Sequence, residues 1–390
     1  MTSDRIVDAT DAKSSSLYSS NVNGRLMSID ALRGFDMFWI VGGSVIADAL
    51  HKMQGGGVTT IIKTQMEHAK WEGFTFCDLI FPLFIFISGM SIVFSLSKSI
   101  QKHGRPATIK KVIRRSVLLF IMGLIYNGGW ENSIQSLRVM GVLQRIALCY
   151  LFTGILFCFF RPRVLAYWCA GILVVYWVAM TFIPVPGVGA GDFSAPEMNL
   201  SNWIDSKILP FHLHNNKSWD PEGAFSTLPA IASCLLGVFA GLLLKDEQRE
   251  SIKKVKILVM TGAIALLAGW LWHFQFPIIK KIWTSSYVLV AAGFSAWLIA
   301  VFYYIIDIRE YRRWASPFVW IGMNPITIYF LARLINFRRL AARVTGGPVQ
   351  ALLDAHLAQG LGGLVTALAG MCLVMWVCWF LYRKKIFLRV

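Results

Sequence analysis

The stretch EHAKWEGFTFCDLIFPLFIFISG, from Glu67 to Gly89, sets ionisable side chains against the start of a long apolar run. His68 carries the imidazole group that most often acts as a general base or nucleophile near neutral pH. Charged groups beside a membrane helix cost free energy unless they are solvated, paired or used. On the residues alone, His68 is either a solvent-facing loop histidine or a group that handles a proton or an acyl group.

Two carboxylates of this stretch compete as the partner of His68. If a helix begins near His68, Asp78 lies about three helical turns away and Glu72 only one turn away. This interpretation makes Glu72 the group that orients His68 and leaves Asp78 to support the helix bundle. Asp78 would come closer only if residues 68–74 formed a loop. We expect Trp71 to shape the pocket beside Glu72.

A second set of polar residues falls inside apolar stretches. Asp30, Arg33 and Asp36 follow one another at intervals of three, so Arg33 can pair with either carboxylate on a helix. These residues either fix helix packing as internal ion pairs or line a polar cavity, since ionisable residues in membrane segments are functional candidates. The same two interpretations apply to three later residues: Gln144, Arg145 and Asn324.

The elements that must position these side chains are membrane helices. The chain of 390 residues is 56% hydrophobic and 15% charged, whereas soluble proteins contain about 25% charged residues. A membrane helix needs roughly 20 mainly apolar residues. The sequence predicts an all-α polytopic membrane protein with about ten such segments: 29–50, 75–97, 116–137, 139–160, 164–184, 224–244, 257–273, 286–306, 316–337 and 361–382.

The formal charge of +17 is distributed as a membrane topology requires. With the N-terminus in the cytoplasm, the basic clusters fall on one side, which is the positive-inside pattern. This pattern predicts cytoplasmic N- and C-termini, contact with anionic lipid in the inner membrane, and no nucleic-acid partner. The clusters are 98–115, 161–163, 245–256, 309–313 and 383–389.

The rest of the chain has a simple organisation. Residues 1–24 are polar, without the apolar core of a signal peptide, and predict a disordered cytoplasmic tail. Residues 25–390 are predicted to form one transmembrane domain with an outer loop at 185–223. The seven cysteines sit in or beside apolar segments without metal-ligand spacing. We therefore expect them to be small buried side chains and expect no metal site.

The outer loop at 185–223 contains residues suited to a sugar. Trp219 and Glu222, with Trp71, would offer flat aromatic faces and a carboxylate to such a ligand. An ordinary outer loop with interfacial tryptophans explains the same residues. His212 and His214 could place two imidazoles on one face of a strand, but they lack a third ligand at a recognisable spacing.

Several motifs, in order from residue 25 to 337, resemble the heparan-α-glucosaminide N-acetyltransferase family. They are RLMSIDALRGFDM (25–37), HAKWEGFTFCDLIFPLFIFISG (68–89), RVMGVLQRIALCY (138–150), PEG (221–223), SYVLVAAGFS (286–295) and GMNPITIY (322–329). The resemblance implies transfer of an acetyl group from cytosolic acetyl-CoA to a glucosamine amine across the membrane. It also implies that His68 is catalytic and that the protein is a homodimer. The stretch before His68 is longer than in the family's lysosomal enzyme, which makes the acceptor sugar the least defined property.

If acetyl-CoA is the donor, its phosphates would meet Arg114 and Arg115 on the basic face, with Arg33 nearby. The pantetheine arm would thread along Gln144, Arg145 and Asn324 towards His68. The main alternative is an amino-sugar transporter of the inner membrane, although transporters usually contain internal repeats with paired broken helices. A purely structural scaffold would leave the intramembrane Arg and Asp residues unexplained.

Overall fold

A computed structural model describes residues 26–128, 137–209 and 219–387. Within these ranges the chain is helical, with one isolated bridge between Val185 and Gly189. The predicted tail at residues 1–24 lies outside the described residues, as do His212 and His214.

The helices follow one another with short connections. Those of the first half are α2 (Met27–Phe38), η1 (Trp39–Gly43), α3 (Ser44–Gln54), α4 (Gly57–Met66), α5 (Phe76–Tyr126), α6 (Val142–Phe159), α7 (Pro162–Phe182), η3 (Pro196–Met198) and α8 (Leu200–Ile208). Those of the second half are α9 (Thr227–Lys245), α10 (Ser251–His273), η5 (Lys280–Ile282), α11 (Ser285–Phe302), η6 (Tyr303–Ile308), η7 (Arg313–Ala315), α12 (Ser316–Gly322), α13 (Pro325–Leu334), α14 (Phe337–Thr345), α15 (Pro348–His356) and α16 (Leu361–Arg383).

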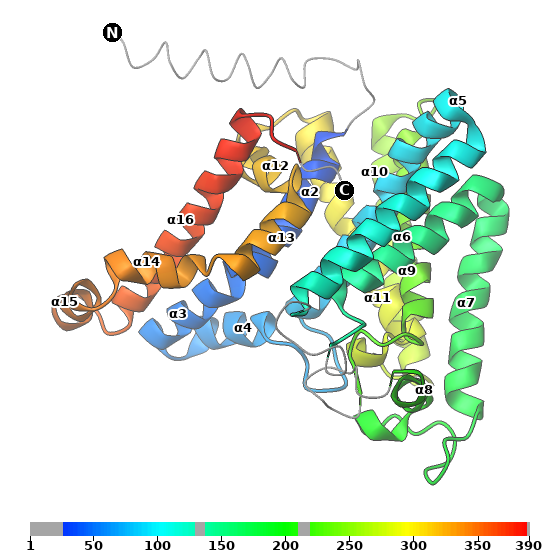
Figure 1. The fold of residues 1–390 in the computed structure, drawn as a ribbon, viewed down its shortest axis with the longest axis horizontal. Helices are drawn as coiled ribbons and strands as arrows, with labels where there is room; N and C mark the ends of the chain where they lie inside the picture. The colour runs from blue at the N-terminus through cyan, green and yellow to red at the C-terminus, as the bar shows by residue number, and fades with distance from the viewer. Residues whose placement is uncertain (1–25, 129–136, 210–218, 388–390) are drawn as a thin grey trace.

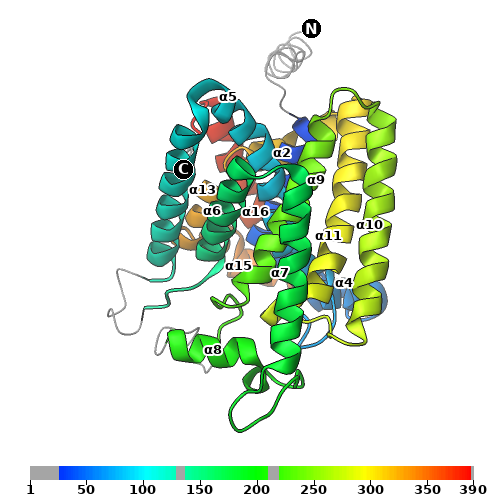
Figure 2. The same cartoon turned by 90° about the vertical axis from the view of Figure 1, so that its right-hand side faces the viewer.

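The helices form two adjoining groups (Figure 1). Helices α5, α6, α7, α9, α10 and α11 stand roughly side by side, and α8 lies across one end of them (Figure 2). Helices α2, α3, α12, α13 and α16 form the other group, with the short α4, α14 and α15 at its lower edge (Figure 1). The first half of α5 packs between the groups, because it contacts α9 and α11 as well as α2.

Within the described residues, seven helices are long and apolar enough to cross a membrane, or up to eight if a bent pair counts as one span. This confirms an all-helical, multi-pass membrane protein but does not confirm ten spans. Helix α5 contains the segment predicted at 75–97 and the first part of the one predicted at 116–137, of which residues 129–136 lie outside the described residues. Between the two segments the chain leaves helical geometry at Gly104, where φ is 77°. A positive φ costs glycine little, and the Thr108 hydroxyl reaches back to Ser99 Oγ at 3.0 Å. The two arms of α5 therefore form a hairpin (Figure 1).

Two other predicted segments differ from simple spans. The segment predicted at 29–50 is helical through α2, η1 and α3, but it is not among the seven apolar spans. The segment predicted at 316–337 is broken into α12 and α13, which are bent by 69°. The break falls at Asn324, directly before Pro325, which lacks the backbone N–H that a continuous helix needs.

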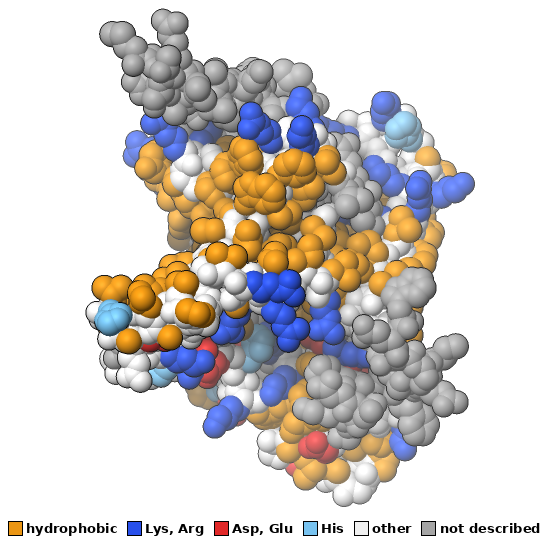
Figure 3. All heavy atoms as spheres, turned by 60° about the vertical axis from the view of Figure 1, so that its left-hand side comes forward, with side chains coloured by type: hydrophobic (Ala, Val, Ile, Leu, Met, Phe, Trp, Pro, Cys, Tyr) orange, Lys and Arg blue, Asp and Glu red, His pale blue; other side chains and the backbone are white. Residues whose placement is uncertain are grey.

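The surface shows a broad apolar belt with charged side chains above and below it (Figure 3). We call the end with the α5 turn at Gly104 and the α9–α10 turn the basic end, and the end with loops 67–75 and 274–284 the histidine end. Figure 1 shows the α5 turn at the top and α8 at the bottom. The first arm of α5 therefore runs from the histidine end to the basic end.

Helix α5 crosses α9 through paired glycines. A Cβ atom on Gly237 would lie 1.9 Å from the carbonyl oxygen of Phe86, and one on Gly89 would lie 2.0 Å from that of Cys234. Membrane helices use small residues in this way because close backbone approach supplies the packing that water-driven burial does not. This crossing holds the arm of α5 on which the sites described below are built.

We expect Gly237→Ala to lower the free energy of unfolding by about 1–3 kcal/mol, because the added methyl group has no room. Thermal unfolding in detergent, followed by tryptophan fluorescence, measures the effect. Gly171→Ala in α7 is the matched control, since a Cβ there meets nothing within 4 Å. Equal melting temperatures for the two variants would contradict the close crossing.

Candidate active site

A capping box fixes the start of α5 at the histidine end. Thr75 is the N-cap residue and Asp78 the third helical residue, and each side chain is bonded to the backbone of the other. Asp78 Oδ2 accepts hydrogen bonds from the backbone N–H groups of Thr75 at 3.2 Å and Ala69 at 3.1 Å. Thr75 also donates its hydroxyl to the carbonyl oxygen of Glu67 at 2.8 Å. The helix therefore begins at Phe76, and residues 67–75 form a loop that returns over its first turn.

This loop places His68 directly on Asp78. His68 Nδ1 lies 2.9 Å from Asp78 Oδ1, so the interpretation that makes Glu72 the partner of His68 is wrong, and the alternative in which a loop brings Asp78 close to His68 is the one the structure shows. The prediction assumed a helix that starts near His68, whereas the capping box delays it to Phe76. Glu72, the predicted partner, lies 3.5 Å from His273 instead. Asp78 is 1% exposed and the His68 side chain 57% exposed, so the carboxylate is fixed and the imidazole faces outwards.

Lys280 is a third charged group at this site. Its Nζ lies 3.3 Å from Asp78 Oδ1 and 3.0 Å from His68 Nδ1. The hydrogen bond that His68 donates to Asp78, with a smaller effect of the Cys77 contact, raises the pKa of His68 to about 9, against the opposing effects of burial and of the Lys280 cation. His68 Nδ1 therefore carries a proton that it donates to Asp78 near neutral pH, and Lys280 donates to the same carboxylate. Burial lowers the pKa of Lys280 from its ordinary value.

Cys77 lies on the opposite side of the imidazole. Its Sγ is 3.8 Å from His68 Nε2. Cys77 is partly exposed, and Cys372 of α16 is exposed. The expectation that all seven cysteines are buried is therefore wrong for these two and holds for the other five. Cys77 is exposed because it occupies the outward-facing side of the first turn of α5.

An aromatic and acidic wall stands next to this group. The rings of Trp71 and Trp219 meet edge to face with centroids 6.3 Å apart, and Lys281 Nζ lies within 5.9 Å of both ring centroids. Glu222 contacts Arg138, which also holds the buried Asp220 through two bonds of 2.5 and 2.8 Å. The structure thus brings together Trp71, Trp219 and Glu222, the three residues predicted to bind a sugar.

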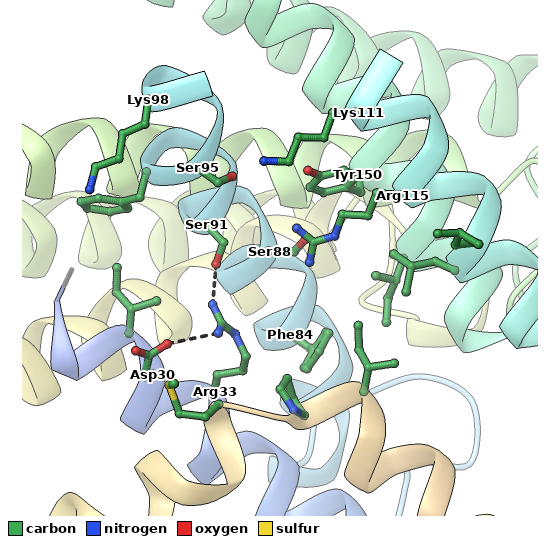
Figure 4. Close-up of a pocket in the computed structure, with 18 of the residues that line it drawn as sticks. Asp30, Arg33, Phe84, Ser88, Ser91, Ser95, Lys98, Lys111, Arg115 and Tyr150 are labelled. Atoms are coloured by element: carbon green, nitrogen blue, oxygen red, sulfur yellow. Dashed lines mark hydrogen bonds and ion pairs between the residues drawn. The ribbon is translucent and has the colours of Figure 1, made fainter. Parts of the chain in front are cut away.

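A cavity of about 690 Å³ opens among α2, the two arms of α5, α6 and the break before α13. Figure 4 shows its basic side chains converging from both arms of α5 and from α2. Arg33 Nη2 bonds Ser91 Oγ at 2.5 Å, and the Arg115 guanidinium lies over the Tyr150 ring at 4.6 Å. The basic residues that line the cavity are Arg33, Lys98, Lys111, Arg114 and Arg115.

Several polar residues predicted for this cavity lie elsewhere. Arg145 is fully buried, bonds the carbonyl oxygen of Gly223 at 3.1 Å and lies over the Trp283 ring. Gln144 is buried too, and Asn324 donates to the carbonyl oxygen of Ile386 at 2.9 Å. None of these three is among the residues that line the cavity. Arg33 pairs with Asp30 at 3.2 Å.

The first arm of α5 joins the cavity to the His68 site. Cavity residues on this arm reach down to Phe84. A small apolar pocket follows, which shares Phe84 with the cavity and continues to Phe81. Phe81 is three residues, about 4.5 Å along the helix, from Asp78. The basic cavity and the His68 site thus lie at opposite ends of the first arm of α5, with the small apolar pocket between them.

The described residues contain no group of three or more His, Cys, Asp or Glu side chains that could hold a metal ion. The site residues predicted from the sequence do not include Cys77, Lys280 or Arg138. Lys280 and Arg138 had a signal, because both are basic residues at the end opposite to the main basic clusters. The signal for Asp78 was the spacing Thr-x-x-Asp at 75–78, which is typical of a capping box before an apolar run.

The fold and these two sites define a multi-pass membrane protein with an ionisable site at one end and a cation-lined cavity reaching in from the other. Residues 25–275 match the family described as heparan-alpha-glucosaminide N-acetyltransferase, catalytic. The chain belongs to this family, as its motifs predicted. It is 28% identical to human heparan-alpha-glucosaminide N-acetyltransferase and 26% identical to the mouse protein of that name, over 94% of this chain. The matches cover 60% of each of these longer relatives.

Because Asp78 raises the pKa of His68, the imidazolium and its pairing persist through neutral pH and are lost as the pH rises through about 9. We expect Asp78→Asn to lower the midpoint of His68 titration to near or below its ordinary value of about 6.5, since Lys280 remains beside it. Diethyl pyrocarbonate reacts with neutral imidazole, so peptide mass spectrometry of its adduct on His68 across pH gives the midpoint.

Glu72→Gln serves as the control for this measurement and should leave the midpoint near pH 9. A lowered midpoint in Glu72→Gln, with none in Asp78→Asn, would restore Glu72 as the partner of His68.

Proposed function

We propose that this protein transfers an acetyl group from acetyl-CoA to the amine of a glucosamine-type sugar on the opposite side of the membrane. The observation that carries the proposal is the placement of two sites on the first arm of α5, a cavity lined by five cations towards the basic end and the His68–Asp78 pair at the start of the helix. The human and mouse relatives are named as heparan-alpha-glucosaminide N-acetyltransferases, which supports the same reaction.

The cavity suits acetyl-CoA both at its exposed rim and along its deeper wall. Its exposed rim carries Lys98, Lys111 and Arg114, and the half-buried Arg115 lies among them. These four cations would meet the phosphates of CoA. The wall below is lined by Ser88, Ser91 and Ser95 on one face of α5, and these hydroxyl groups can bond the amides of the pantetheine arm. The apolar end at Phe84 suits the uncharged thioester. Acetyl-CoA is a co-substrate here, and no metal enters the proposal.

The histidine end suits the acceptor. The faces of Trp71 and Trp219 would cover the apolar face of a sugar ring, and the Glu222 carboxylate would attract its ammonium group. Lys281 holds the loop in place, because it bonds the carbonyl oxygen of Lys70. The acceptor would lie beside His68, where the acetyl group arrives.

His68 is the proposed catalytic group, with Asp78 and Lys280 as positioning residues. Asp78 holds the ring by Nδ1, so Nε2 faces the reacting atoms. A histidine in this position can accept a proton from the acceptor amine or give one to the leaving thiolate of CoA. Glu72 pairs with His273 and would help to hold the conformation of loop 67–75.

The proposed orientation places the basic end and both termini in the cytoplasm and the histidine end outside the inner membrane. Residues 25–390 would form one transmembrane domain. The resemblance to the family also leads us to propose that the protein is a homodimer. An amino-sugar transporter is favoured by one observation, the bend between α12 and α13. Transporters usually contain broken helices in corresponding halves, and the described residues contain one such pair.

We expect Arg115→Gln to weaken CoA binding roughly 10- to 100-fold, because a charge-assisted contact contributes about 1.5–3 kcal/mol. Isothermal titration of the purified protein with CoA measures this affinity. Arg161→Gln is the matched control, since Arg161 is exposed at the basic end and does not line the cavity. Unchanged affinity in Arg115→Gln would move the phosphate site away from the cavity.

Vesicles with labelled acetyl-CoA at the basic end and glucosamine at the histidine end test the whole reaction. We expect labelled N-acetylglucosamine on the glucosamine side, and we expect His68→Ala to lose this product by roughly 100-fold or more while it still binds CoA. Movement of unmodified glucosamine without acetylation would favour the transporter. Full turnover by His68→Ala would exclude His68 as the catalytic group.

A further inference from the structure

Three side chains at the histidine end stand in the order thiol, imidazole, carboxylate. Cys77 Sγ lies 3.8 Å from His68 Nε2, and His68 Nδ1 lies 2.9 Å from Asp78 Oδ1. Each ring nitrogen of His68 thus has its own partner, and the carboxylate that holds the ring is buried and fixed by backbone N–H groups. This is the arrangement in which nucleophile, base and orienting group act together in acyl transfer.

The surroundings of Cys77 suit a nucleophile. It occupies the first turn of α5, and its Sγ lies 3.8 Å from His68 Nε2. The N-terminal end of a helix favours negative charge on nearby groups, and the thiolate is the nucleophilic form of a cysteine. The residue is partly exposed, so a substrate can reach the sulfur. Of the six other cysteines, Cys372 is exposed and five are buried.

We propose that Cys77 is a second catalytic residue, which takes the acetyl group from acetyl-CoA as a thioester before passing it to the amine. The proposal rests on the proposed function, because acetyl-CoA and an amine acceptor define both half-reactions.

The two half-reactions balance. In the first, the Cys77 thiolate attacks the acetyl carbonyl carbon, the bond from that carbon to the CoA sulfur breaks, and the leaving thiolate takes the Nε2 proton of His68. In the second, the neutral amine attacks the Cys77 thioester, the carbon–sulfur bond breaks, and His68 takes the proton released by the amine. The products are CoA thiol and the N-acetyl sugar, and Cys77 and His68 return to their initial state.

The charge of His68 explains why Cys77 would act as the nucleophile and His68 as the acid and base. A histidine that is protonated near neutral pH has no free lone pair at Nε2, so it cannot attack the thioester itself. It can donate a proton to the departing CoA sulfur, and then it is neutral and ready to act as a base for the amine. A thioester intermediate also stores the acetyl group at the histidine end without a bound CoA molecule.

Acid-quenched protein incubated with radiolabelled acetyl-CoA and no acceptor provides the direct test. We expect the label on the peptide that contains Cys77, released by hydroxylamine, and we expect Cys77→Ala to lose both the label and about 100-fold or more of acetyl transfer. Cys77→Ala should keep its affinity for CoA, which shows that the variant is folded. Cys372→Ala, in which an exposed cysteine far along the chain is replaced, should behave as wild type.

If the acetyl-enzyme does not accumulate in the wild type, turnover by Cys77→Ala decides the question. Wild-type rates in Cys77→Ala, or a label on His68 instead of Cys77, would overturn the role of Cys77 and leave the proposed function intact. A wild-type protein that binds acetyl-CoA but acetylates no amine would overturn the proposed function itself, so the two failures are distinguishable.

Discussion

The reciprocal bonds between Thr75 and Asp78 are the constraint on which the rest of the site depends. They end the loop and begin α5 at Phe76, and they use one oxygen of Asp78 while leaving the other for His68 and Lys280. The Asp78 carbonyl oxygen also accepts a bond of 2.7 Å from the Tyr287 hydroxyl of α11. A single residue therefore caps a membrane helix, joins two helices and orients the imidazole.

The two charged regions of the protein stay apart because apolar residues separate them. Cations at the basic end line an open cavity, so water and a bound anion can solvate them. At the histidine end, Arg138 is paired with the carboxylate of Asp220 and Lys280 with that of Asp78. Phe81 and Phe84 fill the stretch of α5 between the two regions. Only a small uncharged group fits such a junction without a large desolvation cost.

Much of this arrangement follows from the sequence. The apolar segments, the basic end and the position of His68 beside a helix start were all predictable from composition and motif. The His68–Asp78 contact was also predictable, had the capping box at 75–78 been used to place the helix start. The break at Asn324 had a signal too, because Asn-Pro favours a turn. The burial of Arg145 against Trp283 and the approach of Lys280 to Asp78 had none, since they join residues more than a hundred positions apart.

The depth of the cavity has an electrical consequence. Its lining on α5 extends from Lys98 to Phe84, about 21 Å of helix, against a hydrocarbon thickness of about 30 Å. Water and ions in the cavity would carry the electrical potential of the aqueous phase at the basic end to that depth, so most of the membrane voltage would fall across the short apolar junction. Each elementary charge that crossed there would exchange about 2.3 kcal/mol per 100 mV with the field. An acetyl group carries no charge, so its passage would be independent of the energised state of the membrane.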